Sequence, residues 1–360
     1  MGAATPNGRQ MIPHNRPLIL PCDRAAVDAV LASGWIAQGP ATRGLEDRFV
    51  GYFGGGAACA SASGTAALLV ALKALGAGPG AVVALPTYSC SALLDAVFMS
   101  GAEPEVVDVC ADTFCLDGQL VSQQAPTARF IVAVHTFGAP ADIARLSAPG
   151  RTVVEDCCQS FGGALAGEPL GSRGAVAVFS FYATKIITGG QGGLIWTRWA
   201  EAAARARSYL QSNGAERYEP RFNLQITDIQ AALADSQMRR LESIRERRSE
   251  IGRAYLAALP HGLSAQTGIA DPGRMVHRFV VVTPDRATRE ALRERMATAG
   301  VGCIVPVERF ELLHRCLRLD ADAYPVAERL VDTTLSLPVH LNLSDADVST
   351  VCDVLRRFEP

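Results

Sequence analysis

Short apolar stretches alternate with helical segments along the first two-thirds of the chain, and this alternation constrains the fold more than any other feature. The apolar stretches cover residues 57–63, 81–86, 103–109, 129–135, 151–156, 175–181 and 192–197. Continuous apolar runs separated by helices are typical of strands buried on both faces of a mostly parallel sheet. We therefore predict an α/β fold with such a sheet at its centre.

The segments around these strands indicate how the chain is divided. Helices are predicted over residues 23–31, 42–53, 65–76 and 91–101. One long helix is predicted over 227–259, and residues 276–358 then follow the order strand, helix, strand, helix. A chain of 360 residues exceeds what one small core needs. The predicted units are an extended, Pro-rich N-terminal arm (1–22), a large domain (23–245) and a small C-terminal α/β domain (246–360).

Charge and cysteine usage exclude several classes of partner. The formal net charge is −2, which argues against nucleic acid or an anionic membrane surface as the main partner. No apolar stretch is long enough to cross a bilayer. The ten cysteines include no CxxC pair, and no zinc-binding or phosphate-loop motif occurs, so no metal site is expected. We interpret the cysteines as buried free thiols and expect a cytoplasmic protein.

The chain contains very few lysines. Of 34 basic residues, 32 are arginine, and the only lysines are Lys73 and Lys185. Lys73 lies within the predicted helix 65–76, about two turns from its start, where its side chain is expected to extend to solvent. Lys185 lies in a polar segment between a buried strand and the glycine-rich turn 189–193. Any chemistry that needs a lysine amine is therefore assigned to Lys185.

Polar residues gather where predicted strands end. Ser63-Gly64-Thr65 lies where a strand passes into a helix, so it is either a phosphate cup or an ordinary helix N-cap. Asp156 ends a second strand, where a carboxylate either caps a turn or faces a ligand crevice. Ser180 ends a third strand, shortly before Lys185. Pyridoxal phosphate (PLP) needs a lysine amine, a carboxylate at its ring nitrogen and a phosphate cup, and the chain contains one of each.

These motifs occur within a longer resemblance. The chain resembles the DegT-type sugar aminotransferases, a family of fold-type-I PLP enzymes, over nearly its whole length. The matching stretches include SASGTAALLVALKALGAGPG (61–80), LPTYSCSALLDAVFMSGAEPEVVDV (85–109), VVEDCCQSFGGALAGEPLGSRG (153–174), FSFYATKIITGGQGGLIWT (179–197) and FNLQITDIQAALADSQMRRL (222–241). The resemblance implies a fold-type-I PLP transferase with a large and a small domain.

The resemblance also implies roles for individual residues. Lys185 matches the lysine that forms the aldimine with PLP and moves the substrate proton, and Asp156 matches the partner of the ring nitrogen. Gln159 matches the residue near the phenolic oxygen of the cofactor. The phosphate cup would consist of Ser63, Gly64, Thr65 and Ser180. Asn223 matches an asparagine that reaches the phosphate from the neighbouring subunit, which implies a homodimer with shared active sites.

Several positions depart from the family pattern. Cys90 stands where the family usually places an aromatic residue over the cofactor ring, so the ring is expected to sit differently or to lean on Tyr88. A free cysteine is more often a small packing residue than a nucleophile. Phe161 replaces the family's common histidine, whereas His314 matches a later one. Tyr88, Phe161 and His314 are therefore the candidate substrate residues.

These observations together predict a PLP-dependent aminotransferase. The expected donor is an amino acid, glutamate or glutamine, and the expected acceptor is a nucleotide-linked keto-deoxysugar in amino-sugar synthesis. Family members that catalyse dehydration replace the lysine by histidine, so the presence of Lys185 favours transamination. Two alternatives stay open: a PLP enzyme acting on a non-sugar substrate in secondary metabolism, and a non-catalytic regulatory partner with the same fold.

Overall fold

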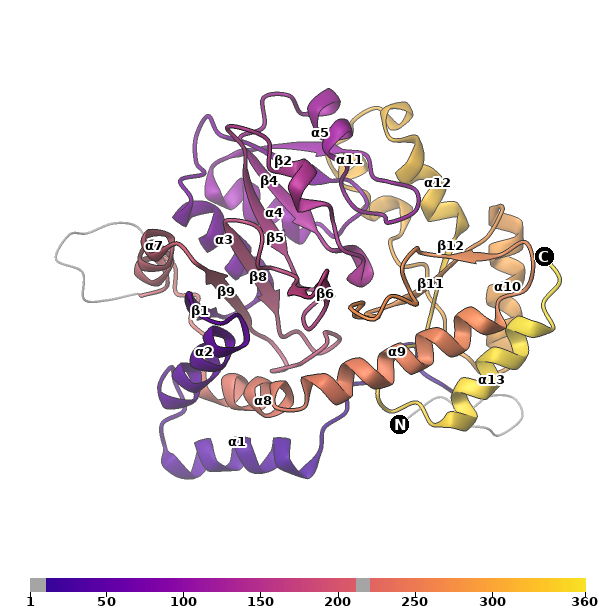
Figure 1. Ribbon diagram of the computed structural model, residues 1–360, viewed down its shortest axis with the longest axis horizontal. Helices are drawn as coiled ribbons and strands as arrows, with labels where there is room; N and C mark the ends of the chain where they lie inside the picture. The colour runs from indigo at the N-terminus through magenta and orange to yellow at the C-terminus, as the bar shows by residue number, and fades with distance from the viewer. Residues whose placement is uncertain (1–10, 212–220) are drawn as a thin grey trace.

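The computed structural model describes residues 11–211 and 221–360 and places a seven-stranded sheet at the centre of the larger part of the chain (Figure 1). The strand order is β1-β9-β8-β5-β4-β2-β3. The strands are β1 (Ala57–Ser61), β2 (Val82–Pro86), β3 (Glu103–Val107), β4 (Phe130–Val134), β5 (Thr152–Asp156), β8 (Val176–Ser180) and β9 (Gly193–Thr197). Strands β3, β2, β4, β5 and β8 run parallel to one another, and β9 is antiparallel to its neighbours β8 and β1. The mostly parallel sheet is thus confirmed.

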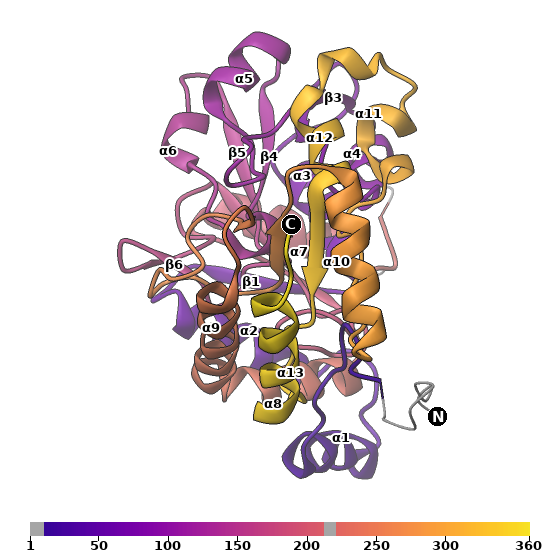
Figure 2. The ribbon, with the colours of Figure 1, turned by 90° about the vertical axis from the view of Figure 1, so that its right-hand side faces the viewer.

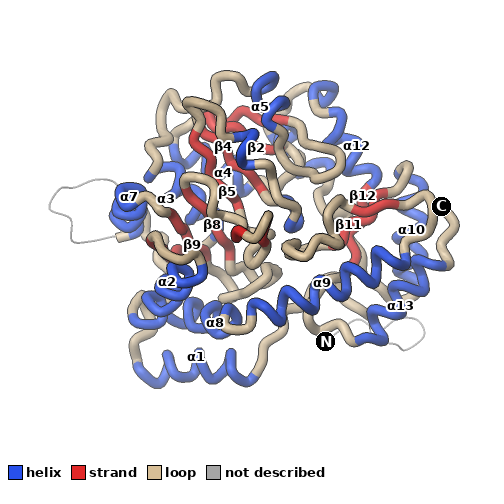
Figure 3. The backbone as a smooth tube through the Cα atoms, in the orientation of Figure 1, coloured by secondary structure: helices blue, strands red, loops and turns tan. Residues whose placement is uncertain are grey.

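Helices cover both faces of this sheet, which explains the continuous apolar strands (Figure 3). One face packs against α3 (Gly64–Ala74), α4 (Ala92–Ser100) and α7 (Ala200–Leu210). The other face packs against α2 (Pro40–Tyr52), α5 (Gly118–Gln124), α6 (Ile143–Leu146) and α8 (Asp228–Met238). Along β8, Val176 and Val178 join the first core, whereas Ala177 and Phe179 join the second. Because successive side chains point to opposite faces, every position of such a strand is apolar.

A smaller unit follows, built on the antiparallel sheet β10-β11-β12. Its strands are β10 (Ser264–Ala265), β11 (Phe279–Val282) and β12 (Thr334–Leu337), and its core helices are α9 (Leu241–Ala258), α10 (Arg286–Thr298) and α13 (Asp345–Arg356). Figure 2 shows α10, β12 and α13 together on one side of the molecule. The predicted order of strand, helix, strand and helix corresponds to β11, α10, β12 and α13. The connection between α10 and β12 also contains η2 (Arg309–Glu311), α11 (Leu313–Cys316), η3 (Ala321–Ala323) and α12 (Pro325–Thr333).

The predicted single helix over 227–259 is wrong, because the chain forms two helices, α8 and α9, that are separated at Arg239 and Arg240. The backbone of Arg240 leaves the helical region, with φ −117° and ψ 23°. Its guanidinium pairs with the buried carboxylate of Asp23, which also accepts the Ser236 hydroxyl at 2.8 Å. This network ties the break to α1 (Pro21–Ser33). No glycine or proline marks the break in the sequence, since its cause lies more than 200 residues away.

Helix α9 spans the predicted domain boundary at residue 245. Near its start, Leu241 and Ile244 pack into a core of the large sheet, whereas Ile251 and Tyr255 pack into the core of the small unit. The helix therefore contributes to both cores. The exact division of the chain into domains stays a prediction.

Residues 11–20 of the predicted N-terminal arm form no helix and connect the two parts of the molecule. Ile12 forms a β-bridge with Val301 of the small unit. The side chain of Asn15 donates a hydrogen bond to the carbonyl of Thr184 at 3.3 Å, next to Lys185. Residues 1–10 lie outside the described residues.

All ten cysteines are free, as expected, but their burial was predicted only in part. Cys22, Cys90 and Cys316 are exposed, in contrast to the expected buried thiols.

Within residues 11–211 and 221–360, none of the helices combines the length and the apolar character needed to span a bilayer.

Candidate active site

A pocket of about 200 Å³ lies at the carboxyl ends of the central strands. Eight of the nine predicted cofactor-binding residues line it: Ser63, Gly64, Thr65, Cys90, Asp156, Gln159, Ser180 and Lys185. These residues come from the ends of four strands or from the loops that follow them. Because parallel strands end at the same edge of the sheet, segments more than 100 residues apart converge there.

The N-terminus of α3 forms one wall of the pocket. Ser63 is the N-cap of α3, and its hydroxyl accepts a hydrogen bond from the backbone N–H of Ala66 at 3.1 Å. A Cβ atom added to Gly64 would lie 2.8 Å from Cβ of Ser180 and 3.2 Å from its Oγ. Glycine therefore allows the start of α3 to approach the Ser180 hydroxyl closely. A helix N-terminus beside a hydroxyl is a suitable site for a phosphate, because unpaired N–H groups and the helix dipole face the anion.

Asp156 also lines the pocket and lies at the end of β5. Its Oδ1 accepts the backbone N–H of Cys158 at 2.9 Å, and that bond does not use Oδ2. The neighbouring thiol is not a competing anion, because burial, with a contribution from Asp156, raises the pKa of Cys158 well above its ordinary value. The pocket therefore offers a carboxylate to a cationic group of a ligand.

Lys185 is half-buried in the loop after β8, and its backbone N–H donates to the carbonyl of Tyr182 at 2.9 Å. Lys73 does not line the pocket. It lies near the far end of α3, and its amine is 5.7 Å from the centre of the Tyr209 ring. The nine residue-to-residue steps from Gly64 to Lys73 correspond to about 14 Å of helix. Lys185 is thus the lysine that faces the pocket.

Gln159 and Cys90 complete the lining that was predicted. The side-chain oxygen of Gln159 accepts the backbone N–H of Phe137 at 3.0 Å, so its amide N–H₂ group stays available to a ligand. Cys90 has access to solvent, yet desolvation by the surrounding chain raises the pKa of its thiol. The neutral thiol favours a packing role for Cys90 over a nucleophilic one.

A buried hydrogen-bond network supports β5 on the side away from the pocket residues. The side chains of His135, Glu155 and Cys157 place potential ligand atoms within 4.8 Å of one another. However, His135 Nε2 is bonded to Glu155 at 3.0 Å, and its Nδ1 accepts the N–H of Ala141 at 2.9 Å. Glu155 also accepts the N–H of Gly171 at 3.0 Å. With both imidazole nitrogens engaged, this cluster holds the strand that carries Asp156 and offers little to a metal ion.

The three predicted substrate residues do not line the pocket but lie in the core. The hydroxyl of Tyr88 is buried and bonded to Thr334 Oγ1 at 3.0 Å. Phe161 stacks on Phe49 with ring centres 4.8 Å apart. His314 is fully buried, with Nδ1 2.7 Å from Thr87 Oγ1 and Nε2 2.9 Å from Glu328 Oε1.

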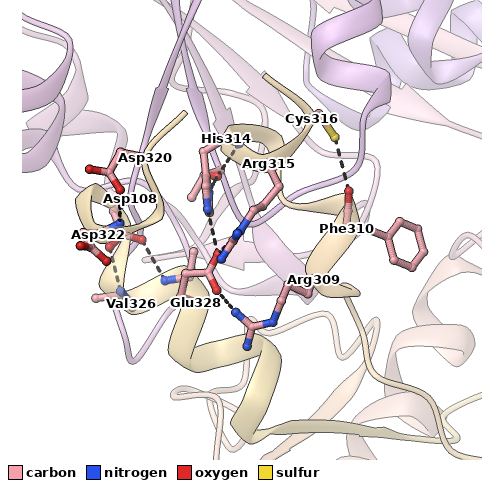
Figure 4. Close-up of polar contacts among 12 residues, drawn as sticks. Asp108, Arg309, Phe310, His314, Arg315, Cys316, Asp320, Asp322, Val326 and Glu328 are labelled. Carbon is pink, nitrogen blue, oxygen red and sulfur yellow. Dashed lines mark hydrogen bonds and ion pairs between the residues drawn. The ribbon is translucent and has the colours of Figure 1, made fainter. Parts of the chain in front are cut away.

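Figure 4 shows the surroundings of His314. Its imidazole points to Glu328, which also pairs with Arg309 and Arg315. The ring stacks on Tyr324 at 4.3 Å. Burial, together with the two arginines, lowers the pKa of His314 to about 4. In this state the histidine is a neutral structural residue that holds the segment between η2 and α12.

Asn223 is exposed and does not line the pocket of its own chain. The lining residues that were not predicted individually include three with hydroxyl or amide side chains, namely Ser89, Tyr182 and Gln191. Each adjoins a motif that the sequence does mark: Ser89 precedes Cys90, Tyr182 lies between Ser180 and Lys185, and Gln191 lies in the glycine-rich turn. Their orientation toward the pocket depends on the loops and has no signal of its own in the sequence.

A larger hollow of about 940 Å³ lies between α1, α2 and α8. Its carboxylate Asp228 is already saturated, because it accepts the N–H groups of Gly39, Ala41 and Thr42 at 2.8–2.9 Å. This carboxylate therefore joins α8 to the start of α2 and is a structural group.

Comparison with known proteins agrees with this geometry. The chain is 30% identical over 375 residues to the spore coat polysaccharide biosynthesis protein SpsC of Bacillus subtilis strain 168, covering 96% of each. It is similar to the structure of Spr1654 from Streptococcus pneumoniae in its PMP form, with a TM-score of 0.89, 26% identity and coverage of 96% and 97%. It is also similar to the aminotransferase TlmJ from Streptoalloteichus hindustanus, with a TM-score of 0.88, 30% identity and coverage of 96% and 98%. Residues 20–356 match the sequence profile of the DegT/DnrJ/EryC1/StrS aminotransferases, and the chain belongs to that family.

Proposed function

We propose that the protein transfers an amino group from glutamate or glutamine to the keto group of a nucleotide-linked keto-deoxysugar, with PLP as its cofactor. The observation that carries this proposal is the convergence of Lys185, Asp156 and the N-terminus of α3 on one pocket. Two comparisons support it. SpsC is a polysaccharide biosynthesis protein, and Spr1654 has been solved in PLP and PMP forms.

The residues of the pocket fit the chemical groups of PLP. The N–H groups at the start of α3 and the Ser180 hydroxyl would hold the phosphate, in the narrow space that the absence of a Cβ on Gly64 leaves open. Asp156 would hold the protonated ring nitrogen through the oxygen that is not bonded to Cys158. The amide of Gln159 would donate to the phenolic oxygen. When bound, PLP supplies a carbonyl carbon that reacts with amines and a ring that withdraws electrons from it.

Each side chain then has a defined task. The Lys185 amine lies on the loop after β8, within the same pocket as Asp156, and would take and return the proton at the substrate carbon. The negative charge of Asp156 would keep the ring nitrogen protonated. The backing of β5 by His135 and Glu155 fixes the position of this carboxylate. Cys90 would contact the cofactor ring as a small neutral side chain.

We also propose that the active unit is a homodimer with shared sites. Asn223 is exposed and does not line the pocket of its own chain, which supports a contact with the phosphate site of a neighbouring subunit. The side chains of Phe98 and Met99 on α4 and of Tyr182 at the pocket are apolar and exposed, and they offer apolar surface to such an interface. The free cysteines support a reducing compartment, the cytoplasm.

Absorption spectroscopy of the purified protein tests the cofactor and the lysine. The protein reconstituted with PLP is expected to show a visible absorption band that disappears when glutamate or glutamine is added. Lys185→Ala should lose this band, whereas the matched variant Lys73→Ala should keep it, because Lys73 lies over Tyr209 away from the pocket. A band of unchanged intensity in Lys185→Ala would contradict the proposal.

The acceptor is tested separately with the amino-loaded enzyme. Nucleotide-linked keto-deoxysugars should restore the visible band. Simple keto acids should restore it poorly, apart from the keto acid that forms when the donor loses its amino group. If simple keto acids restored the band and no nucleotide sugar did, the proposed sugar acceptor would be wrong and the acceptor would be a non-sugar substrate.

A further inference from the structure

Arg278, the residue before β11, is a cation without a counter-ion among the described residues. Its Nη1 atom is buried and has no hydrogen-bond partner within residues 11–211 and 221–360. The carboxylate that influences it, Glu311, is exposed and accepts the backbone N–H of Glu308 at 2.7 Å. The Arg278 side chain is half-buried, and a buried guanidinium nitrogen left unpaired is destabilising, so such atoms usually meet a partner.

Other buried arginines of the chain do meet partners. Arg248 donates to the carbonyls of Val276, His277 and Val339 at 3.1–3.3 Å. Arg274 donates to the carbonyl of Thr267 at 2.9 Å. These two arginines serve the fold by bonding to backbone. Their Nε atoms are unpaired, but both arginines bond through Nη1, whereas the Nη1 of Arg278 has no partner within the described residues. We take this unpaired atom to indicate a partner that comes from outside the chain.

The surroundings of Arg278 place it next to the pocket. Its guanidinium carbon is 5.5 Å from the centre of the Phe137 ring, and the N–H of Phe137 donates to the pocket residue Gln159. A cation over an aromatic face is held in place by the ring. In Figure 1 the chain that leads into β11 runs back toward the central sheet. Close packing accompanies this path, since a Cβ on Gly138 would lie only 1.8 Å from the carbonyl oxygen of Met275.

The titratable groups around Arg278 leave the site positive. Burial, with contributions from Arg278 and His340, lowers the pKa of His14 to about 3. Burial, with contributions from Lys185 and Arg278, lowers the pKa of His277 well below its ordinary value. Both histidines are therefore neutral near pH 7, and neither provides a negative charge. Arg278 thus contributes a positive charge at the junction of the large and small units that these histidines do not offset.

We propose that Arg278 binds a carboxylate of the amino-acid donor and thereby places the donor's amine at Lys185. The inference rests on the proposed function, which requires an amino acid in this pocket. A guanidinium fork matches a carboxylate with two parallel hydrogen bonds, which orients the bound molecule as well as holding it. The proposed keto-sugar acceptor carries phosphates but no carboxylate, so the carboxylate assigned to Arg278 is that of the donor, in the first half of the reaction.

Ligand binding and donor kinetics test the role of Arg278. Arg278→Gln removes the charge, and Arg278→Lys keeps the charge but not the fork. Arg253→Gln is the matched control, since Arg253 is an exposed arginine on α9. All three variants should retain the visible band of the PLP-loaded protein. Binding of glutarate, a dicarboxylate without an amine, is measured by calorimetry on each loaded protein.

Arg278→Gln is expected to weaken glutarate binding and to raise the donor concentration for half-maximal reaction by about 30-fold or more. Arg278→Lys should fall between wild type and Arg278→Gln, and Arg253→Gln should match wild type. Losses with both glutamate and glutamine would locate the bond at the α-carboxylate, and a loss with glutamate alone would locate it at the side-chain carboxylate. Wild-type values in Arg278→Gln for both donors and for glutarate would overturn the inference.

The two proposals fail in different ways. If the wild-type protein showed no visible band or no response to any amino acid, the proposed function would fail. Glutarate binding would still show whether Arg278 holds a carboxylate.

Discussion

The contact between Gly64 and Ser180 makes a sharp prediction about cofactor binding. In Gly64→Ala the new Cβ would lie 2.8 Å from Cβ of Ser180 and 3.2 Å from Sγ of Cys158. Carbon atoms in contact are ordinarily about 3.5 Å apart or more, so the start of α3 must move away by roughly 0.7 Å. This movement widens the space in which the α3 N–H groups and the Ser180 hydroxyl would hold a phosphate.

The expected size follows from the cost of overpacking. Adding a methyl group to a closely packed site costs about 1–3 kcal/mol. If that cost falls on the holo form, PLP binding weakens by about 5- to 150-fold, because each 1.36 kcal/mol is a factor of ten. The dissociation constant is measured by absorbance titration of the cofactor-free protein, and thermal unfolding is followed with and without PLP.

Gly44→Ala in α2 is the matched control. Nothing lies within 4 Å of its added Cβ, and alanine in a helix is more stable than glycine by about 0.5–1 kcal/mol. The two glycine-to-alanine changes should therefore have opposite effects on stability. If Gly64→Ala bound PLP as tightly as wild type and unfolded at the same temperature, the close approach at Gly64 would have no role in the site.

Three further predictions concern single carboxylates and a thiol. Asp156→Asn should slow the donor half-reaction by about 100-fold or more in stopped-flow absorbance, because a preorganised charge at the cofactor is removed while the fold is kept. Hydrogen bonds from Thr42 and neighbouring N–H groups outweigh burial and lower the pKa of Asp228 below its ordinary 3.8. Asp228→Asn should therefore reduce the free energy of unfolding by about 2–4 kcal/mol at pH 7, and urea titrations should show the gap to wild type closing as the pH falls below about 4. Burial raises the pKa of Cys90, so its thiol is expected to be neutral and Cys90→Ala should keep the rate of the donor half-reaction within a few-fold of wild type. Iodoacetamide labelling of Cys90 should be slow at pH 7 and accelerate with rising pH. Fast labelling at pH 7 would contradict the neutral thiol.

Much of the candidate site could be predicted because its residues carry local signals. Ser63, Asp156 and Ser180 are polar residues at the ends of apolar runs, and parallel strands bring such ends together. Lys185 could be singled out because the chain has only one other lysine. The candidate substrate residues had no comparable signal. Tyr88 and His314 are polar enough to bind a ligand, yet their partners Thr334, Thr87 and Glu328 come from distant segments and hold them in the core.

The amino-acid sequence by itself determined the order of the central strands, the buried parallel sheet and the identity of the pocket lysine. These features follow from hydrophobic periodicity and residue counts, which are local properties of the chain. Only the tertiary structure decided where the long helix breaks, since Arg240 turns toward Asp23 on α1. It also decided which guanidinium nitrogens have partners, because Nη1 of Arg248 meets carbonyl groups and Nη1 of Arg278 meets none within residues 11–211 and 221–360. Partnership between polar groups depends on which distant segments meet, and a one-dimensional pattern of residue types does not record those contacts.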